Sequence, residues 1–102
     1  MEFEVTLWSN TRKDVRASIK GIRINKGFKK YLPKSHSMIT IWLDDKMKHF
    51  LLSNCFNKGC FEVRGKDFYF WAEKHNLDIG DKVILEIIEP LKEYRLKKSI
   101  KE

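Results

Sequence analysis

Two short stretches of the chain combine basic and amide side chains in a way that suits nucleic-acid recognition. The first stretch, residues 20–27, carries Lys20, Arg23, Asn25 and Lys26, with Ile22 and Ile24 between them. Arginine can pair bidentately with guanine and asparagine with adenine, whereas lysine mostly neutralises phosphate. Because these four polar residues cannot share one face of a regular strand, the pattern predicts a twisted arm or loop.

The second stretch, residues 53–59, repeats the same types of side chain over a shorter length. Its polar members are Ser53, Asn54, Asn57 and Lys58. Taken alone, an ordinary β-turn loop explains this composition equally well. Together, the two stretches predict two polar arms on a small domain that reads a nucleic-acid groove.

The charge of the protein is concentrated in the first part of the chain. The sequence has 21 Lys and Arg against 14 Asp and Glu, a net charge of +7. Residues 61–102 carry nine of each sign, so the whole excess lies in residues 1–60. Nine basic residues fall between Arg12 and Lys34 alone. Such a cluster attracts polyanions, although a solvated basic surface would have the same composition.

Metal binding and catalysis have weaker support in the sequence. Residues with suitable side chains are Cys55, Cys60, His36, His49 and His75. Structural zinc sites usually combine two closely spaced ligand pairs, and this chain offers one loose pair. Cys55 with His49 is the one nucleophile and base pair worth considering, and no motif surrounds it. We therefore expect no metal, no cofactor and no enzymatic activity.

The beginning of the sequence has none of the features of an export signal. MEFEVTLWSN is acidic and alternating, whereas a signal peptide has a basic start followed by an apolar stretch. No apolar run approaches the ~20 residues that span a bilayer. We expect a cytoplasmic, membrane-free protein whose Cys55 and Cys60 are reduced thiols.

The length of 102 residues and a hydrophobic content of 42% predict a single domain over residues 1–102. Alternating apolar residues in segments such as 3–7, 38–43 and 82–88 predict about seven short strands. A helical turn at residues 28–32 and a helix from Asp67, as its N-cap, to Asn76 complete the elements. This pattern is typical of a small β-barrel or sandwich, followed by a charged tail over residues 90–102.

Three blocks of the sequence resemble those of a known protein family. They are Arg23–Pro33 (RINKGFKKYLP), Ile39–Lys46 (ITIWLDDK) and Gly65–Asp81 (GKDFYFWAEKHNLDIGD), the last followed by VILEI. In this order they make residues 20–89 resemble the DNA-binding pseudobarrel of the plant "B-three" domains. The same fold serves as the DNA-specificity domain of some bacterial restriction endonucleases. The third block, Gly-x-x-Phe-x-x-Trp ahead of Leu-x-x-Gly-Asp, is the most specific.

The resemblance implies a seven-stranded open β-barrel with two short helices, whose two arms grip the major groove of double-stranded DNA. The arm residues would be Lys20, Arg23, Asn25 and Lys26, then Ser53, Asn54, Asn57 and Lys58, with Arg64 and Lys66 on phosphates. The chain departs from the plant members at Asn25, where many have proline, and its second arm is short. It also lacks an aromatic-rich loop, which favours a prokaryotic-type member.

The leading hypothesis is therefore sequence-specific, non-catalytic binding of double-stranded DNA, alone or as a module of a larger nuclease or regulator. One alternative is RNA or single-strand binding, with bases stacked on Trp8, Trp42 and Tyr69. Another is a protein-interaction or dimer module in which Trp8 and Trp42 are exposed on strands. Ligand sensing inside the barrel is a further option, without a specific polar cluster to support it.

Overall fold

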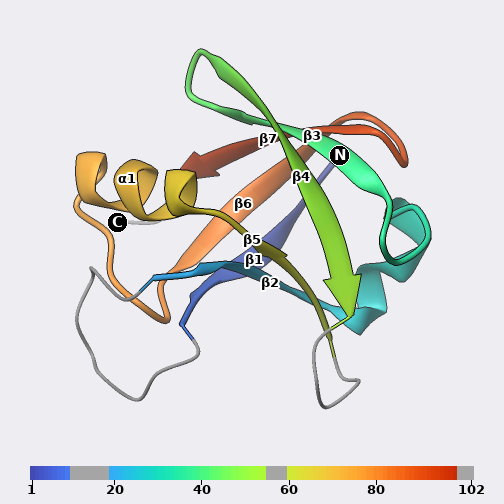
Figure 1. Ribbon diagram of the computed structural model, residues 1–102, viewed down its shortest axis with the longest axis horizontal. Helices are drawn as coiled ribbons and strands as arrows, with labels where there is room; N and C mark the ends of the chain where they lie inside the picture. The colour runs from blue at the N-terminus through green and yellow to red at the C-terminus, as the bar shows by residue number, and fades with distance from the viewer. Residues whose placement is uncertain (10–18, 55–59, 99–102) are drawn as a thin grey trace.

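The computed structural model describes residues 1–9, 19–54 and 60–98, and the strands in this part of the chain form a closed barrel (Figure 1). The strands are β1 (Glu2–Trp8), β2 (Gly21–Asn25), β3 (Met38–Leu43), β4 (Lys46–Asn54), β5 (Cys60–Arg64), β6 (Lys82–Glu89) and β7 (Glu93–Lys98). Their order around the barrel is β1-β2-β5-β4-β3-β7-β6. β3 and β7 run parallel, and all the other pairs are antiparallel.

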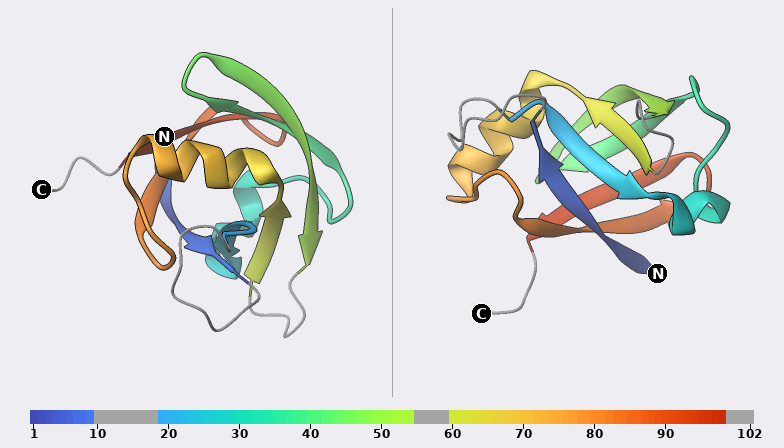
Figure 2. Two further views of the ribbon diagram at one scale, coloured as in Figure 1. Left: turned by 60° about the vertical axis from the view of Figure 1, so that its left-hand side comes forward. Right: turned by 90° about the horizontal axis from the view of Figure 1, so that it is seen from below.

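The predicted mainly β fold, with seven strands and one or two short helices, is confirmed. Hydrogen bonds between β1 and β6 close the ring, whereas the family likeness implied an open barrel. Closure removes the free strand edges that an open sheet would present to other chains. The α-helix α1 (Lys66–Lys74) and the 3-10 helix η2 (Lys26–Tyr31) lie at opposite ends of the barrel (Figure 2).

Alternating apolar side chains fill the barrel, as the period-two patterns predicted. The buried strand residues include Val5, Leu7, Ile22, Ile24, Ile39, Ile41, Leu52, Val63, Val83, Leu85 and Leu96. At one end, α1 buries Phe68, Trp71 and Ala72, the face expected from their spacing. At the other end, the rings of Phe28 and Tyr31 from η2 stack on Phe3.

The start of α1 differs from the prediction. Gly65, not Asp67, is the N-cap residue, and no side chain of the described residues caps the helix. A Cβ atom at Gly65 would lie 2.8 Å from a ring carbon of Phe50, so close packing selects glycine here. Asp67 falls in the first turn instead, where the positive end of the helix dipole favours a carboxylate. The helix ends at Lys74, just before the predicted Asn76, which is left-handed with φ of 58°.

The first predicted arm is a regular strand rather than a twisted loop. Residues 21–25 form β2, which is paired with β1 on one side and β5 on the other. Ile22 and Ile24 point into the core, and Arg23 and Asn25 occupy the alternate outer positions. The prediction failed because Lys20 and Lys26 flank the strand and need not share a face with the residues inside it.

Cys60 also differs from expectation, because it is disulfide-bonded rather than a reduced thiol. The other cysteine of the sequence, Cys55, lies outside the described residues. Part of the predicted charged tail belongs to the barrel, since Glu93–Lys98 forms strand β7.

Candidate nucleic-acid interface

Strand pairing brings the described members of the two predicted arms to one surface. Arg23 on β2 lies opposite Glu62 on β5, and Glu62 lies opposite Ser53 on β4. These three residues form one row on the outside of three neighbouring strands. We call the outer surface of β2, β5 and the last residues of β4 the β2–β5 face. Asn57 and Lys58 lie outside the described residues.

The remaining predicted residues sit at the two ends of this face. Near α1, Lys20, Arg64 and Lys66 line a common shallow hollow. At the other end, Asn25 is the last residue of β2, Lys26 follows it, and Asn54 is the last residue of β4. All three are exposed. At about 3.3 Å per residue, the five residues of β2 extend over roughly 15 Å. That length is comparable to the width of the DNA major groove, about 12 Å.

A buried carboxylate organises the centre of the face. Glu62 has an exposed fraction of 4% and is the buried charged residue of the described part of the chain. Arg64 holds it tightly: Nη2 lies 2.8 Å from Oε1, and Nε donates to the same oxygen at 3.0 Å. Arg23 approaches Oε2 only to 3.8 Å, through Nη2. A buried carboxylate needs such partners, because an unpaired one would be costly to desolvate.

Both guanidinium groups also lie over the indole ring of Trp8. Their central carbons are 4.7 Å (Arg23) and 5.0 Å (Arg64) from the ring centre, within cation–π range. Trp8 is consequently 8% exposed, so the expectation of an exposed Trp8 is wrong. We refer to Trp8, Arg23, Glu62 and Arg64 as the Trp–Arg cluster. Sequence reasoning missed Trp8 and Glu62 as members of this site, since only strand pairing brings them together.

The two arginines of the cluster are not equivalent. Arg64 is committed to Glu62 through two of its nitrogens. Arg23 has a buried Nε without a hydrogen-bond partner, and its ion pair with Glu62 is long. The Arg23 side chain is 38% exposed, so the donors that it keeps for a partner outside the protein are its terminal nitrogens, while Glu62 and Trp8 limit the directions its guanidinium can take.

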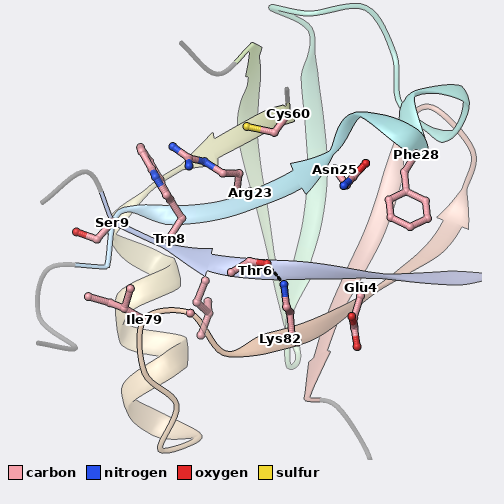
Figure 3. A pocket seen from close by; sticks show the side chains of 12 residues that line it. Glu4, Thr6, Trp8, Ser9, Arg23, Asn25, Phe28, Cys60, Ile79 and Lys82 are labelled. Atoms are coloured by element: carbon pink, nitrogen blue, oxygen red, sulfur yellow. Dashed lines mark hydrogen bonds between the residues drawn. The ribbon is translucent and has the colours of Figure 1, made fainter. Parts of the chain in front are cut away.

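Next to the cluster, an open pocket of about 510 Å³ covers the outer surface of β1 and β2 (Figure 3). Thr6 on β1 lies opposite Arg23 on one side and Lys82 of β6 on the other. The Lys82 ammonium donates to Thr6 Oγ1 at 3.0 Å. Nothing local in the sequence indicates this contact, which joins residues 76 positions apart.

The other aromatic candidates are engaged in contacts of their own. Half-buried Trp42 donates its indole N–H to Glu93 at 2.6 Å. Half-buried Tyr69 donates its hydroxyl to Glu73 at 3.2 Å. Trp42 lies away from the β2–β5 face, whereas Tyr69 and the exposed Phe70 line the hollow at its α1 end together with Lys20, Arg64 and Lys66. Within the described part of the face, aromatic stacking of a single strand is therefore confined to this end.

The histidines considered for metal or catalytic chemistry are spread over the molecule. His49 contacts Thr40 at 3.0 Å, and His75 Nε2 lies 2.9 Å from the Asp44 carboxylate. Cys55, the potential partner of His49, lies outside the described residues. Within residues 1–9, 19–54 and 60–98, no three His, Cys, Asp or Glu side chains gather as a metal site would require.

Comparison of the chain with protein-family models, with curated proteins and with solved structures finds no match. The family likeness read from the sequence therefore stays a prediction. Among the described residues, no helix has the length and apolar character needed to cross a membrane.

Proposed function

We propose that the protein binds double-stranded DNA sequence-specifically, without catalysis, through the β2–β5 face. The Trp–Arg cluster is the observation that supports this most directly. It holds two guanidinium groups at defined positions on a rigid sheet, and arginine is the side chain that most often reads guanine in the major groove. The sequence likeness to the "B-three" domains points in the same direction and would make the protein a partner or module of a nuclease or regulator.

The charge of the face suits a duplex. Five described cations surround the single buried carboxylate of Glu62: Lys20, Arg23, Lys26, Arg64 and Lys66. Four of them are exposed and Arg23 is half-buried. Lysines at the two ends are well placed to neutralise phosphates on either side of a groove, while Arg23 and Asn25 between them face the bases. In this arrangement Arg23 contributes specificity, and Arg64 with Glu62 positions it.

The alternative of single-strand or RNA binding has less support. Its three aromatic candidates are Trp8, Trp42 and Tyr69. Trp8 is covered by Arg23 and Arg64, Trp42 bonds to Glu93 away from the face, and Tyr69, at the α1 end of the face, bonds to Glu73. A stacking mechanism would require at least one of these rings to leave its present contacts.

The test is fluorescence anisotropy with matched random pools of duplex DNA, single-stranded DNA and RNA at low and moderate salt, followed by selection of the preferred duplex. We expect tighter binding to duplex DNA and enrichment of a short motif. Absence of duplex binding even at low salt would contradict the proposal. Tight binding to single strands alone would favour the stacking alternative.

The sharpest variant is Arg23→Ala. Loss of a bidentate arginine–guanine contact should weaken binding to the selected site by about 1–3 kcal/mol and relax the preference at one base pair. Arg95→Ala is the matched control, because it removes the same charge from β7, where Arg95 faces Glu86 at 3.7 Å. An equal loss on all duplex sequences would leave Arg23 a phosphate contact rather than a base reader.

A further inference from the structure

The pocket beside the Trp–Arg cluster contains a row of three polar side chains. Arg23, Thr6 and Lys82 lie in register on the neighbouring strands β2, β1 and β6. With adjacent strands about 4.8 Å apart, the outer two Cα atoms are separated by roughly 10 Å. Both end residues have long side chains: Lys82 points toward Thr6, whereas the Arg23 guanidinium lies beside Trp8 and would turn toward Thr6 to share one small ligand with Lys82 (Figure 3). Lys82 already reaches Thr6 Oγ1 at 3.0 Å.

The chemistry of the row selects an oxyanion. Its two ends are cationic, and the hydroxyl of Thr6, which accepts from Lys82, still has its own hydrogen to donate to a ligand. The Arg23 side chain is 38% exposed, and a guanidinium fork matches the oxygens of phosphate. The fixed backbone positions on three bonded strands preorganise the site, which lowers the entropic cost of binding.

The rest of the pocket is too large and too varied for a free phosphate. Its volume is about 510 Å³, with Phe28 at one end and Trp8 and Ile79 at the other (Figure 3). Asn25 lies between Arg23 and Phe28 (Figure 3), and its Oδ1 already accepts from Gly27 N at 2.7 Å. Its amide NH2 therefore faces ligands as a donor. Glu4, at the rim near Lys82, adds an acceptor that suits a hydroxyl or an exocyclic amine.

We propose that this pocket binds a nucleoside monophosphate, with Arg23, Thr6 and Lys82 on the phosphate and the base toward Phe28 and Asn25. The nucleotide can come from two sources: a free monophosphate, or one nucleotide of a nucleic-acid strand. The proposal rests on the proposed function only for the second source, where the pocket would extend the β2–β5 face across β1.

The experiment is calorimetric titration of the full chain with the four deoxynucleoside 5′-monophosphates, the matching nucleosides and inorganic phosphate. Tryptophan fluorescence gives a second readout, because Trp8, one of the three tryptophans of the chain, lines the pocket. We expect at least one monophosphate to bind about tenfold or more tightly than its nucleoside, which lacks the charge-assisted contacts, and than inorganic phosphate, which lacks the contacts of the base. Lys82→Met and Thr6→Val should each reduce this affinity severalfold.

Lys92→Met is the matched control. It removes the same charge from an exposed side chain in the β6–β7 turn that does not line the pocket. Thermal unfolding of each variant checks that the barrel is intact. Because Lys82 is exposed and Thr6 half-buried on the outer surface, neither substitution opens a core cavity.

Parallel titrations with a single strand and with the selected duplex separate the two sources. If Lys82→Met weakens a strand or duplex but free monophosphates do not bind, the nucleotide belongs to a strand. If no monophosphate binds and Lys82→Met leaves strand and duplex binding unchanged, the pocket proposal is overturned, and duplex binding by the wild type still stands. Monophosphate binding without any duplex binding would instead overturn the proposed function alone.

Discussion

Glu62 is a buried carboxylate beneath a basic surface. Its role is to orient the guanidinium groups beside it, not to change the net charge of the face. It binds Arg64 at 2.8 Å and faces Arg23 at 3.8 Å, both close to Trp8. Without it, two guanidiniums would repel each other and turn toward solvent. The electrostatic cost of keeping a negative charge at an anion-binding face is therefore offset by the fixed geometry of its neighbours.

Replacing Glu62 with glutamine should separate these two contributions. The variant keeps the shape but loses the charge, so we expect a loss of about 1–3 kcal/mol in the free energy of unfolding, measured in urea. Binding to random duplex should become tighter because the face gains one positive charge, while discrimination of the selected site should fall. Glu86→Gln is the control, since Glu86 pairs with Arg95 on β7. Unchanged discrimination would show that Glu62 does not position Arg23.

At the scale of elements, one carboxylate connects α1 to the β3–β4 turn. Asp44 in that turn accepts hydrogen bonds from Trp71 Nε1 at 3.3 Å and lies 3.1 Å from Lys74 Nζ. His75 Nε2 lies 2.9 Å away, at the end of the helix. Burial alone would raise the pKa of Asp44, but hydrogen bonds and charges from Lys74 and His75 outweigh it and lower the pKa below 3.8. The turn thus holds α1 over the end of the barrel.

Asp44→Asn should destabilise the fold in a pH-dependent way. Because the folded pKa is lowered, the contribution of the carboxylate is present above the unfolded pKa and lost as pH falls through the folded value. We expect a loss of about 1 kcal/mol at neutral pH that shrinks toward pH ~3 in urea unfolding. Asparagine tolerates the left-handed backbone of residue 44, where φ is 62°. Asp45→Asn, in the same turn, is the control, and an equal loss at both pH values would contradict the prediction.

A second connection holds η2 to the strands. Buried Tyr94 on β7 donates its hydroxyl to the carbonyl of Tyr31, the last residue of η2, at 2.6 Å. Burial raises the pKa of Tyr94 to about 12. The folded state therefore keeps the proton between about pH 10 and 12 while the unfolded state releases it, so stability falls over this range.

Tyr94→Phe should remove both effects. We expect a loss of about 1 kcal/mol at neutral pH, because the Tyr31 carbonyl loses its partner, and a shallower decline of stability above pH ~10. Urea unfolding across this range measures both. The half-buried Tyr69, whose hydroxyl contacts Glu73, supplies the control Tyr69→Phe. The same alkaline decline in Tyr94→Phe as in the wild type would rule out this origin.

For the molecule as a whole, the asymmetric charge predicts how binding responds to salt. If about five phosphates are contacted, log K should fall with log salt at a slope of roughly −4 to −5. Lys20→Met should reduce the slope by about one, while the apolar core stays intact. Anisotropy titrations over a salt series give the slope directly. A flat dependence would show that the cations of the β2–β5 face do not contact phosphates.

Local periodicity was enough to predict most of the strands and a mainly β fold, a small barrel or sandwich. Alternation identified β3 and β6 and the inward residues of β2, because each pattern lies within a few positions. Periodicity could not predict the site. The Trp–Arg cluster joins residue 8 to residues 23, 62 and 64 through pairings between strands distant in sequence. The prediction of Asp67 as the N-cap was wrong for the same reason, since the packing of Phe50 against Gly65 decides where α1 begins.

The parallel pairing of β3 with β7 has a consequence for biosynthesis. β7 lies between β3 and β6, so both neighbours have an unpaired edge until residue 98 has left the ribosome. Exposed edges of this kind invite pairing with other chains. During most of its synthesis, the nascent chain therefore has only an incomplete sheet. It remains prone to co-translational aggregation until β7 pairs with β3 and β6.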